Sequence, residues 1–262
     1  MLENYKELKL ARRPNGVLVC TIDSPPGNAI NNAIHQELPR FFTEVNHDPE
    51  TKVIVLTGAG DFAFSAGGDF HTLKYQIEHP NPGGFYEAAQ LVNAMLRLEK
   101  PAVARINGHA MGLGATLALF CDLTVMVDKA KIADPHVKVG FTAGDGGALI
   151  WPMLIGFARA KEYLLTGDSL TGTEAAKIGL INRAVPREKL DEVAYGYADR
   201  LAAGASRSIN WTKTAINMVL RNSIDGLMEA HCGFEMMSQF TADHREAVNA
   251  FLEKRQPVFT GK

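Results

Sequence analysis

The sequence has few cysteines and no paired arrangement of them. Its three cysteines, Cys20, Cys121 and Cys232, stand far apart, without CxxC or metal-ligand spacing. An odd number of unpaired thiols is typical of a reducing compartment. The start of the chain, MLENYKELKLARRPNG, also lacks the apolar run of a signal peptide. We therefore expect free, buried thiols and a cytoplasmic location.

A strong charge of either sign is missing as well. The chain has 27 Lys and Arg against 29 Asp and Glu, a formal net charge of -2. Such a balance gives no overall positive potential to attract nucleic acid or an anionic membrane. No apolar run reaches the roughly 20 residues that a membrane helix needs. We expect neither nucleic acid nor membrane as a partner, and local groups must hold any anionic ligand.

Phosphate-binding fingerprints are absent from the glycine-dense stretches FAFSAGGDF (62–70), INGHAMGLGATLALFCD (106–122) and VGFTAGDGGALIW (139–151). None contains a P-loop or a GxGxxG motif that opens a helix, which disfavours nucleotide hydrolysis and dinucleotide redox chemistry. In the second stretch a glycine-rich turn runs into an apolar helix, where free backbone N–H groups suit an anion or oxyanion. The alternative is that these glycines serve only tight turns and close packing.

What the first half does contain is an alternation of short β-branched runs with helical stretches. Strands are predicted over 17–22, 52–58, 101–108 and 123–127, and helices over 32–47, 84–100 and the GATLALFCD run. Repeated β-α units of this kind predict mostly parallel strands covered by helices.

From residue 156 onward helical patterns dominate. Thr171 and Glu174 form a T-x-x-E capping box, which predicts a helix start. Further helices are expected over 188–202, 206–222, 224–239 and 243–254. The sequence therefore predicts an α/β core over residues 1–200 and a helical region over 201–262, without a linker that would separate independent domains.

Several motifs in fixed order resemble the signature of the crotonase superfamily of enoyl-CoA hydratases and isomerases. They are SPPGNAINNAI, SAGGDF, PAVARINGHAMGLGATLALFCDLTV, the stretch from ADPHVKVG to GDGG, ARAKEYLLTGDSLTGTEAAKIGLINRAVP and the FLEKRQPVF tail. The resemblance covers most of the chain. It implies an α/β, crotonase-like spiral of ββα units with a C-terminal helical region that forms homotrimers or dimers of trimers.

The resemblance also implies an acyl-CoA thioester as substrate. The thioester carbonyl would accept hydrogen bonds from the backbone N–H groups of Gly68 and Leu113. Coenzyme A would lie against residues Asn28, Ala29 and Ile30 and residues Ser65, Ala66 and Gly67, with Lys254 near its phosphates. The alternative for Lys254 is a solvated helix end. We expect no cofactor, because coenzyme A is part of the substrate, and no metal, because backbone donors suffice for an enolate.

The two glutamates that a hydratase of this family uses are missing, since Thr116 and His136 stand at their positions. One acid remains: Asp145 aligns with the carboxylate of family members that shift a double bond. The resemblance therefore favours isomerisation, with Asp145 as proton shuttle and His136 as second acid–base residue. Asp145 could instead be a turn aspartate that accepts glycine N–H groups, and His136 a structural histidine.

Other side chains receive weaker interpretations. Asp69 and Asp122 are expected to fix backbone geometry, and His109 to serve packing rather than chemistry. Phe141 and Trp151 are candidates for the wall of the acyl pocket or simply for the core, and residues 85 and 86 for a lid.

The rival functions are hydration or another crotonase reaction, such as acyl-CoA hydrolysis, decarboxylation or dehalogenation, and non-catalytic acyl-CoA binding.

Overall fold

The structure is a computed structural model that describes residues 2–79, 84–224 and 226–262. At residues 84–86 it describes only the backbone, so the suggested lid side chains Phe85 and Tyr86 lie outside the described residues. The strands are β1 (Leu8–Arg12), β2 (Val17–Ile22), β3 (Val53–Gly58), β4 (Ala63–Ser65), β5 (Ala102–Ile106), β6 (His109–Met111), β7 (Leu123–Val127), β8 (Lys131–Ala133), β9 (Leu170–Thr171) and β10 (Arg183–Val185).

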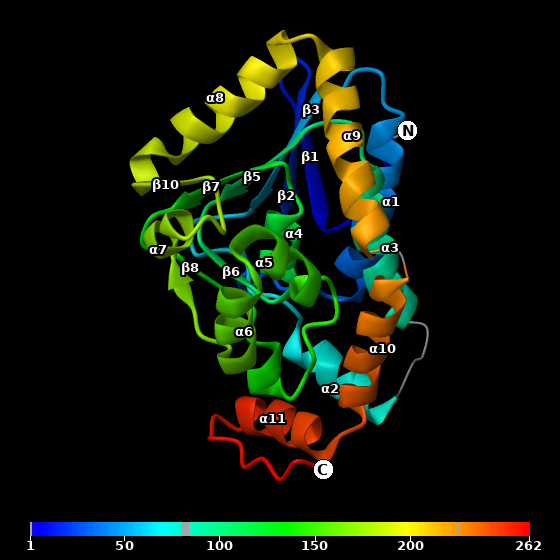
Figure 1. Ribbon diagram of the computed structural model, residues 1–262, viewed down its shortest axis with the longest axis vertical. Coiled ribbons are helices and arrows are strands. Elements are labelled where there is room, and N and C mark those ends of the chain that lie inside the picture. The colour runs from blue at the N-terminus through cyan, green and yellow to red at the C-terminus, as the bar shows by residue number, and fades with distance from the viewer. Residues whose placement is uncertain (1, 80–83, 225) are drawn as a thin grey trace.

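Helices cover both faces and one end of these strands (Figure 1). They are α1 (Asn32–Asn46), α2 (Phe70–Glu78), α3 (Gly84–Arg97), α4 (Leu113–Leu119), α5 (Gly147–Ile155), α6 (Phe157–Thr166), α7 (Gly172–Lys177), α8 (Leu190–Ala203), α9 (Ser206–Ile224), α10 (Leu227–Gln239) and α11 (Ala242–Leu252). Two short 3₁₀ helices, η1 (His136–Val139) and η2 (Arg187–Lys189), complete the structure.

The strands form two sheets, with orders β1-β2-β3-β5-β7-β10 and β4-β6-β8-β9. Consecutive strands β3 and β4, β5 and β6, and β7 and β8 lie in different sheets, so each turn of the chain adds one strand to each sheet. All pairs are parallel except β1 with β2 and β8 with β9. The predicted spiral of ββα turns is confirmed.

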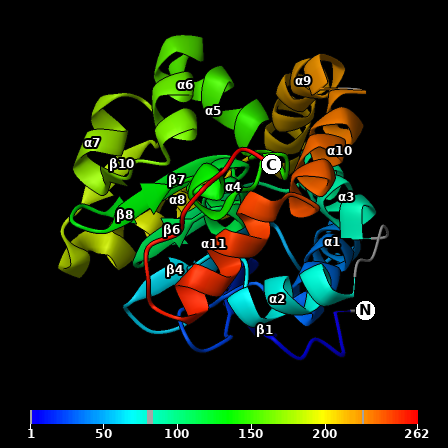
Figure 2. The same ribbon diagram turned by 90° about the horizontal axis from the view of Figure 1, so that it is seen from below.

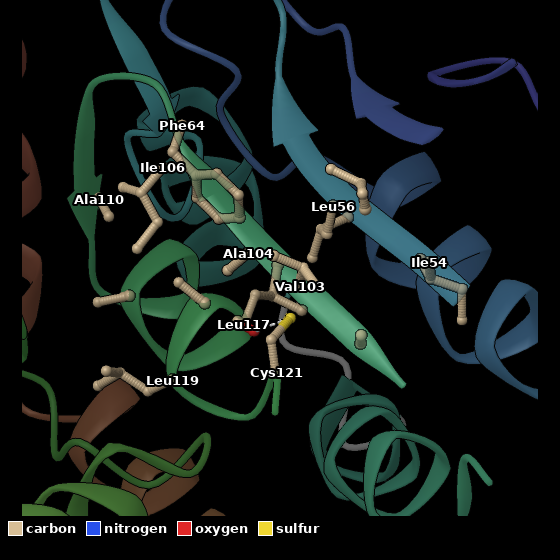
Figure 3. Close-up of a cluster of buried hydrophobic side chains, with 14 of the residues drawn as sticks. Ile54, Leu56, Phe64, Val103, Ala104, Ile106, Ala110, Leu117, Leu119 and Cys121 are labelled. Carbon is tan, nitrogen blue, oxygen red and sulfur yellow. Dashed lines mark hydrogen bonds between the residues drawn. The ribbon is translucent and has the colours of Figure 1, made fainter. Parts of the chain in front are cut away.

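The main core lies on both faces of the larger sheet. Every residue of β3 is buried, as expected for a parallel strand with both faces covered. Helix α8 packs against β3, β5 and β7 and buries residues at four-residue intervals from Leu190 to Ala202. Figure 3 shows part of this core, with Val103, Ala104 and Ile106 of β5 next to Leu117 of α4 and Cys121 just after it. All three cysteines are free and buried, as the sequence predicts.

In Figure 1 the C-terminal helices run down one side of the molecule, with α9 beside its upper part and α10 and α11 at its lower end. Helices α9 and α10 contact α3, and α11 contacts α2 and η1 (Figures 1 and 2). The rings of Phe70 in α2 and Phe251 in α11 stack with their centroids 3.6 Å apart, and this contact joins α2 to α11. Within the described residues, no helix combines the length and apolar character that crossing a bilayer requires.

Candidate active site

A single pocket lies between the glycine-rich turns, α2, η1 and α10. Gly68, Leu113, His136 and Asp145, which were predicted to do the chemistry, all line it. Its apolar lining includes Leu73, Val139 and Phe141 alongside Ile30, Ala66, Ala88 and Met236. Residues more than 160 positions apart in the chain therefore meet around one cavity, whose lining combines apolar and polar side chains.

Two backbone N–H groups are available to this pocket. Ile30 forms a parallel bridge with Gly68 by bonding to Gly67 O at 2.7 Å and to Asp69 N at 3.2 Å. Because those bonds use the peptide groups on either side, the N–H of Gly68 points away from Ile30. Leu113 is the first residue of α4, so its N–H has no acceptor within the helix. The pair suits an oxygen that gains negative charge.

The turns that carry these donors depend on glycine at specific points. Gly67 has φ +84°, and a Cβ there would lie 2.7 Å from the carbonyl oxygen of Met111. Gly114 follows Leu113, and its Cβ would lie 2.7 Å from the Cβ of Ser65. The two turns can approach each other only because both positions lack a side chain.

Asp145 lies in the loop before α5 and is buried. Its Oδ1 accepts a hydrogen bond from the Thr116 hydroxyl at 3.3 Å, and its Oδ2 lies 3.4 Å from His136 Nε2. On its other side, His136 Nδ1 contacts a carboxylate oxygen of Asp134. An imidazole therefore sits between two carboxylates at the edge of the pocket, and Thr116, which replaces one expected glutamate, positions Asp145.

These contacts determine the charges of Asp134, His136 and Asp145, which we call the triad. Burial alone would lower the pKa of His136, but the carboxylates of Asp134 and Asp145 outweigh it and hold that pKa well above its usual value. Burial likewise opposes ionisation of Asp145, but His136 outweighs it and keeps the pKa of Asp145 below its usual value. At neutral pH the triad is one imidazolium between two carboxylates.

The same three residues bring possible ligand atoms within 4.8 Å of one another. Both ring nitrogens of His136 are directed at carboxylates, however, and an imidazolium has no lone pair for a cation. The geometry is that of a hydrogen-bonded ion pair. The expectation of a metal-free site stays a prediction.

The residues expected to hold coenzyme A divide into two groups. Ile30, Ala66 and Gly67 line the pocket. Among the described residues, Asn28, Ala29, Ser65 and Lys254 do not belong to its lining.

The buried members of the second group brace the turns instead. The Asn28 side chain is buried and donates to Ala59 O and Ala63 O, at 2.9 and 2.8 Å. Ser65 Oγ accepts the N–H of Gly67 at 3.2 Å. Lys254 is exposed and follows α11, which ends at Leu252 rather than at the predicted residue 254.

The structural roles expected of two aspartates are confirmed. Asp69 caps α2 by accepting the N–H of Thr72, and Asp122 accepts the N–H of Ala102 and pairs with Lys213. Phe141 lines the pocket, whereas Trp151 is fully buried in the main core. His109 is absent from the pocket lining and accepts the N–H of Lys131.

The sequence analysis missed two acids of this site: Asp134, which belongs to the triad, and Glu235, which lines the same pocket. Asp134 stands two residues before His136 in the ADPH motif, so a local signal for it existed. Glu235 reaches the pocket from α10, 90 positions after Asp145, and no spacing in the sequence connects the two.

Together the fold and the pocket define an α/β enzyme scaffold of stacked ββα turns, with the backbone N–H groups of two glycine-rich turns beside one pocket. The family model for enoyl-CoA hydratase/isomerase matches residues 12–262. This chain belongs to that family, as the sequence motifs indicate.

Individual relatives agree over almost the whole chain. A crotonyl-CoA hydratase of Syntrophomonas wolfei is 33% identical over 98% of this chain and 96% of its own length. A 1,2-epoxyphenylacetyl-CoA isomerase of Escherichia coli is also 33% identical, over 98% of this chain and 99% of its own. The crystal structure of an enoyl-CoA hydratase/isomerase from Mycobacterium paratuberculosis superposes with a TM-score of 0.87, at 32% identity over 93% and 97% of the two chains.

Proposed function

We propose that this protein shifts a double bond in an enoyl-CoA thioester, with Asp145 as the proton shuttle. The observation that carries the proposal is the position of Asp145: an ionised carboxylate lies in the same pocket as the Gly68 and Leu113 N–H groups. A base that removes a proton next to a thioester leaves negative charge on the thioester oxygen. Two preorganised donors lower the energy of that charge, and removing one such donor typically costs about 3–4 kcal/mol of transition-state stabilisation.

His136 has a defined part in this mechanism. As an imidazolium it hydrogen-bonds to Asp145 and keeps the carboxylate ionised and oriented. When Asp145 takes a proton, the pair loses an electrostatic attraction, and the proton is therefore readily passed on to the substrate. His136 in this state is a positioning residue with a proton of its own to give.

The remaining parts of the proposal concern binding and assembly. Residues 28–30 and 65–67 would form the binding site for coenzyme A, with Lys254 near the phosphates, and the chain would act as a homotrimer or dimer of trimers. We also propose that it needs no metal or separate cofactor and acts in the cytoplasm.

The test is turnover of matched 2-enoyl-CoA and 3-enoyl-CoA thioesters in heavy water, followed by mass and double-bond position together. Wild-type protein should interconvert the two with deuterium exchange, and Asp145→Asn should lower kcat roughly 10²- to 10⁴-fold. Asp168→Asn, at an exposed carboxylate on the surface, is the control and should match wild type. Unchanged isomerisation by Asp145→Asn would remove Asp145 from the mechanism.

Hydration is the second candidate, because the Asp134–His136–Asp145 triad also has the groups needed to polarise a water molecule. One relative is named as a crotonyl-CoA hydratase, which adds weight to this candidate. Product mass separates the two reactions, since isomerisation conserves mass and hydration adds one water. Acyl-CoA binding without any turnover would favour a binding protein instead.

A further inference from the structure

Helix α10 brings a fourth ionisable group, Glu235, to the lining of the acyl pocket. Its residue surface is partly accessible, but its Oε2 atom is buried and has no hydrogen-bond partner among the described residues. A buried carboxylate oxygen without a donor is costly when the group is charged, because nothing compensates the charge on that oxygen. Burial of the Glu235 side chain therefore costs little free energy only when its carboxyl group is protonated and neutral.

The position of Glu235 is enforced by the loop that carries Asp145. A Cβ at Gly144 would lie 2.3 Å from the carbonyl oxygen of His231 and 2.7 Å from the Cβ of Glu235. Glycine at this position thus allows α10 to rest directly on the loop. Two hydrogen bonds cross the contact: Thr142 N–H donates to Ser238 Oγ at 3.1 Å, and the Cys232 thiol donates to Gly144 O at 3.7 Å.

The charges around Glu235 favour its protonated form. Burial is the largest cause and the negative charge of Asp145 the next. With Asp134 they raise the pKa of Glu235 to about 8, although His136 and a hydrogen bond from the Gly144 backbone oppose the shift. Cys232, on the same helix, is neutral because burial raises the pKa of its thiol to about 12. From α3, Glu87 lines the same pocket, but its charge is matched by His35 at 3.0 Å.

We propose that Glu235 is a second catalytic residue of this pocket, a neutral carboxyl that gives a proton to the acyl group while Asp145 removes one. The inference rests on the proposed function and refines it: Asp145 stays the base, but the proton that it takes passes to Glu235 rather than directly back to the substrate. It also explains how the pocket manages without the two glutamates that Thr116 and His136 replace. The second carboxyl comes from α10 instead of from those positions.

The proton transfers balance for a 3-enoyl thioester. Asp145 takes a proton from C2, and the electrons of that C–H bond form a dienolate whose oxygen the Gly68 and Leu113 N–H groups hold. Glu235 gives its proton to C4, and the dienolate collapses to the conjugated 2-enoyl thioester. Asp145 is then protonated and Glu235 ionised, and one proton passing from the first to the second restores the enzyme. Two carboxyl groups with pKa values pushed apart by their surroundings are suited to these two roles.

The test uses Glu235→Gln and trans-3-hexenoyl-CoA as the probe, with the full-length protein. Glutamine keeps the size of the side chain but has no proton to transfer, so kcat should fall roughly 100-fold while KM changes little. Wild-type kcat/KM should decline above about pH 8, as Glu235 loses its proton, and this alkaline decline should vanish in the variant. Glu229→Gln, at an exposed position on the same helix, is the matched control and should behave as wild type.

A second readout is independent of the overall rate. In heavy water, Glu235 exchanges its proton with solvent, so the wild-type product should carry deuterium at C4. The residual product of Glu235→Gln should instead carry hydrogen moved internally from C2 to C4 by Asp145. A Glu235→Gln enzyme with wild-type kcat, pH profile and deuterium pattern would overturn the inference while leaving the role of Asp145 intact. If the wild-type protein did not isomerise the substrate, and Asp145→Asn therefore changed nothing, the proposed function itself would be wrong.

Discussion

At the scale of single residues, the feature that matters most is an imidazolium held between two carboxylates. Asp134 has no other role visible near the pocket than to face His136 Nδ1, and its second oxygen, Oδ2, is buried without a partner among the described residues. Gly147 leaves the room for that oxygen, since a Cβ there would lie 1.8 Å from it. The charge of Asp134 therefore acts mainly on His136 and, through it, on Asp145.

Asp134→Asn should make His136 titrate at lower pH. The pKa of His136 is raised in the folded state, so its contribution to stability is complete below the pKa of an unfolded histidine and is lost as the pH rises through the folded pKa. Removing the Asp134 carboxylate lowers the pKa of His136 in the folded state. The stability that protonated His136 contributes is then lost at lower pH than in the wild type. Histidine ring NMR signals and thermal unfolding across pH 5–9 measure both effects. Asp168→Asn, which removes an exposed carboxylate from Lys138 of η1, should change neither.

The residues of the site differ in how far the sequence could specify them. Gly68, Leu113, His136 and Asp145 follow from local motifs, and the structure brings all four to one pocket. Their individual roles stay predictions. Glu235 was missed because it meets Asp145 only through the packing of α10 on Gly144, a contact between distant segments that no local pattern encodes.

At the scale of elements, a polar contact near the edge of the core ties α9 to the sheet. Asp122 follows α4 and accepts the N–H of Ala102 in β5 at 2.7 Å, and it pairs with Lys213 of α9 at 2.7 Å. The Lys213 ammonium also donates to the Lys100 carbonyl and is almost fully buried. One carboxylate thus joins three segments.

Asp122→Ala should destabilise the protein by about 2–3 kcal/mol, because it leaves a buried ammonium without its counter-charge and a strand N–H without its acceptor. Urea unfolding followed by circular dichroism measures the loss. The control is Asp191→Ala, which removes an exposed carboxylate paired with Arg105 of the same strand β5 and should cost at most about 1 kcal/mol. Equal effects of the two substitutions would contradict this account of Asp122.

The longer helices and strands were predictable because each contains enough residues to show a repeating pattern of apolar and polar side chains. The strand expected over 123–127 is β7, and the helix expected over 206–222 is α9, which ends two residues later. The capping box of Thr171 and Glu174 is present at the start of α7. Strands β4, β6 and β8 were not assigned from the sequence, because three residues show no alternation and their pairing depends on segments far along the chain.

At the scale of the whole molecule, the C-terminal helices present many apolar side chains to the outside. Those more than half exposed are Trp211, Ile216, Met218 and Val219 on α9, Phe234 and Met237 on α10 with Phe240 directly after it, and Phe251 on α11. Large apolar side chains gathered on neighbouring helices are typical of a surface that another protein covers. We expect another copy of this chain to do so.

Size-exclusion chromatography with light scattering should therefore give three or six times the mass of one chain at micromolar concentration. Val219→Lys and Met237→Lys place charges on this surface and should shift the population toward monomers without loss of helix content. Glu229→Lys, at an exposed polar position of α10, is the comparison: it changes the charge by two units rather than one but replaces no apolar side chain. A wild-type protein that elutes only as a monomer would refute the assembly.

Because α10 packs on Gly144, the pocket can be completed only late in the synthesis of the chain. The oxyanion donors, the triad and the spiral that carries them all precede α8 in the chain, whereas part of the pocket wall follows α9. A ribosome-bound chain that has folded its spiral would thus have a pocket that is open on the side of α10, with Asp145 in place and Glu235 not yet present. The pocket gains its wall on this side only after α10 has left the ribosome and packed on Gly144.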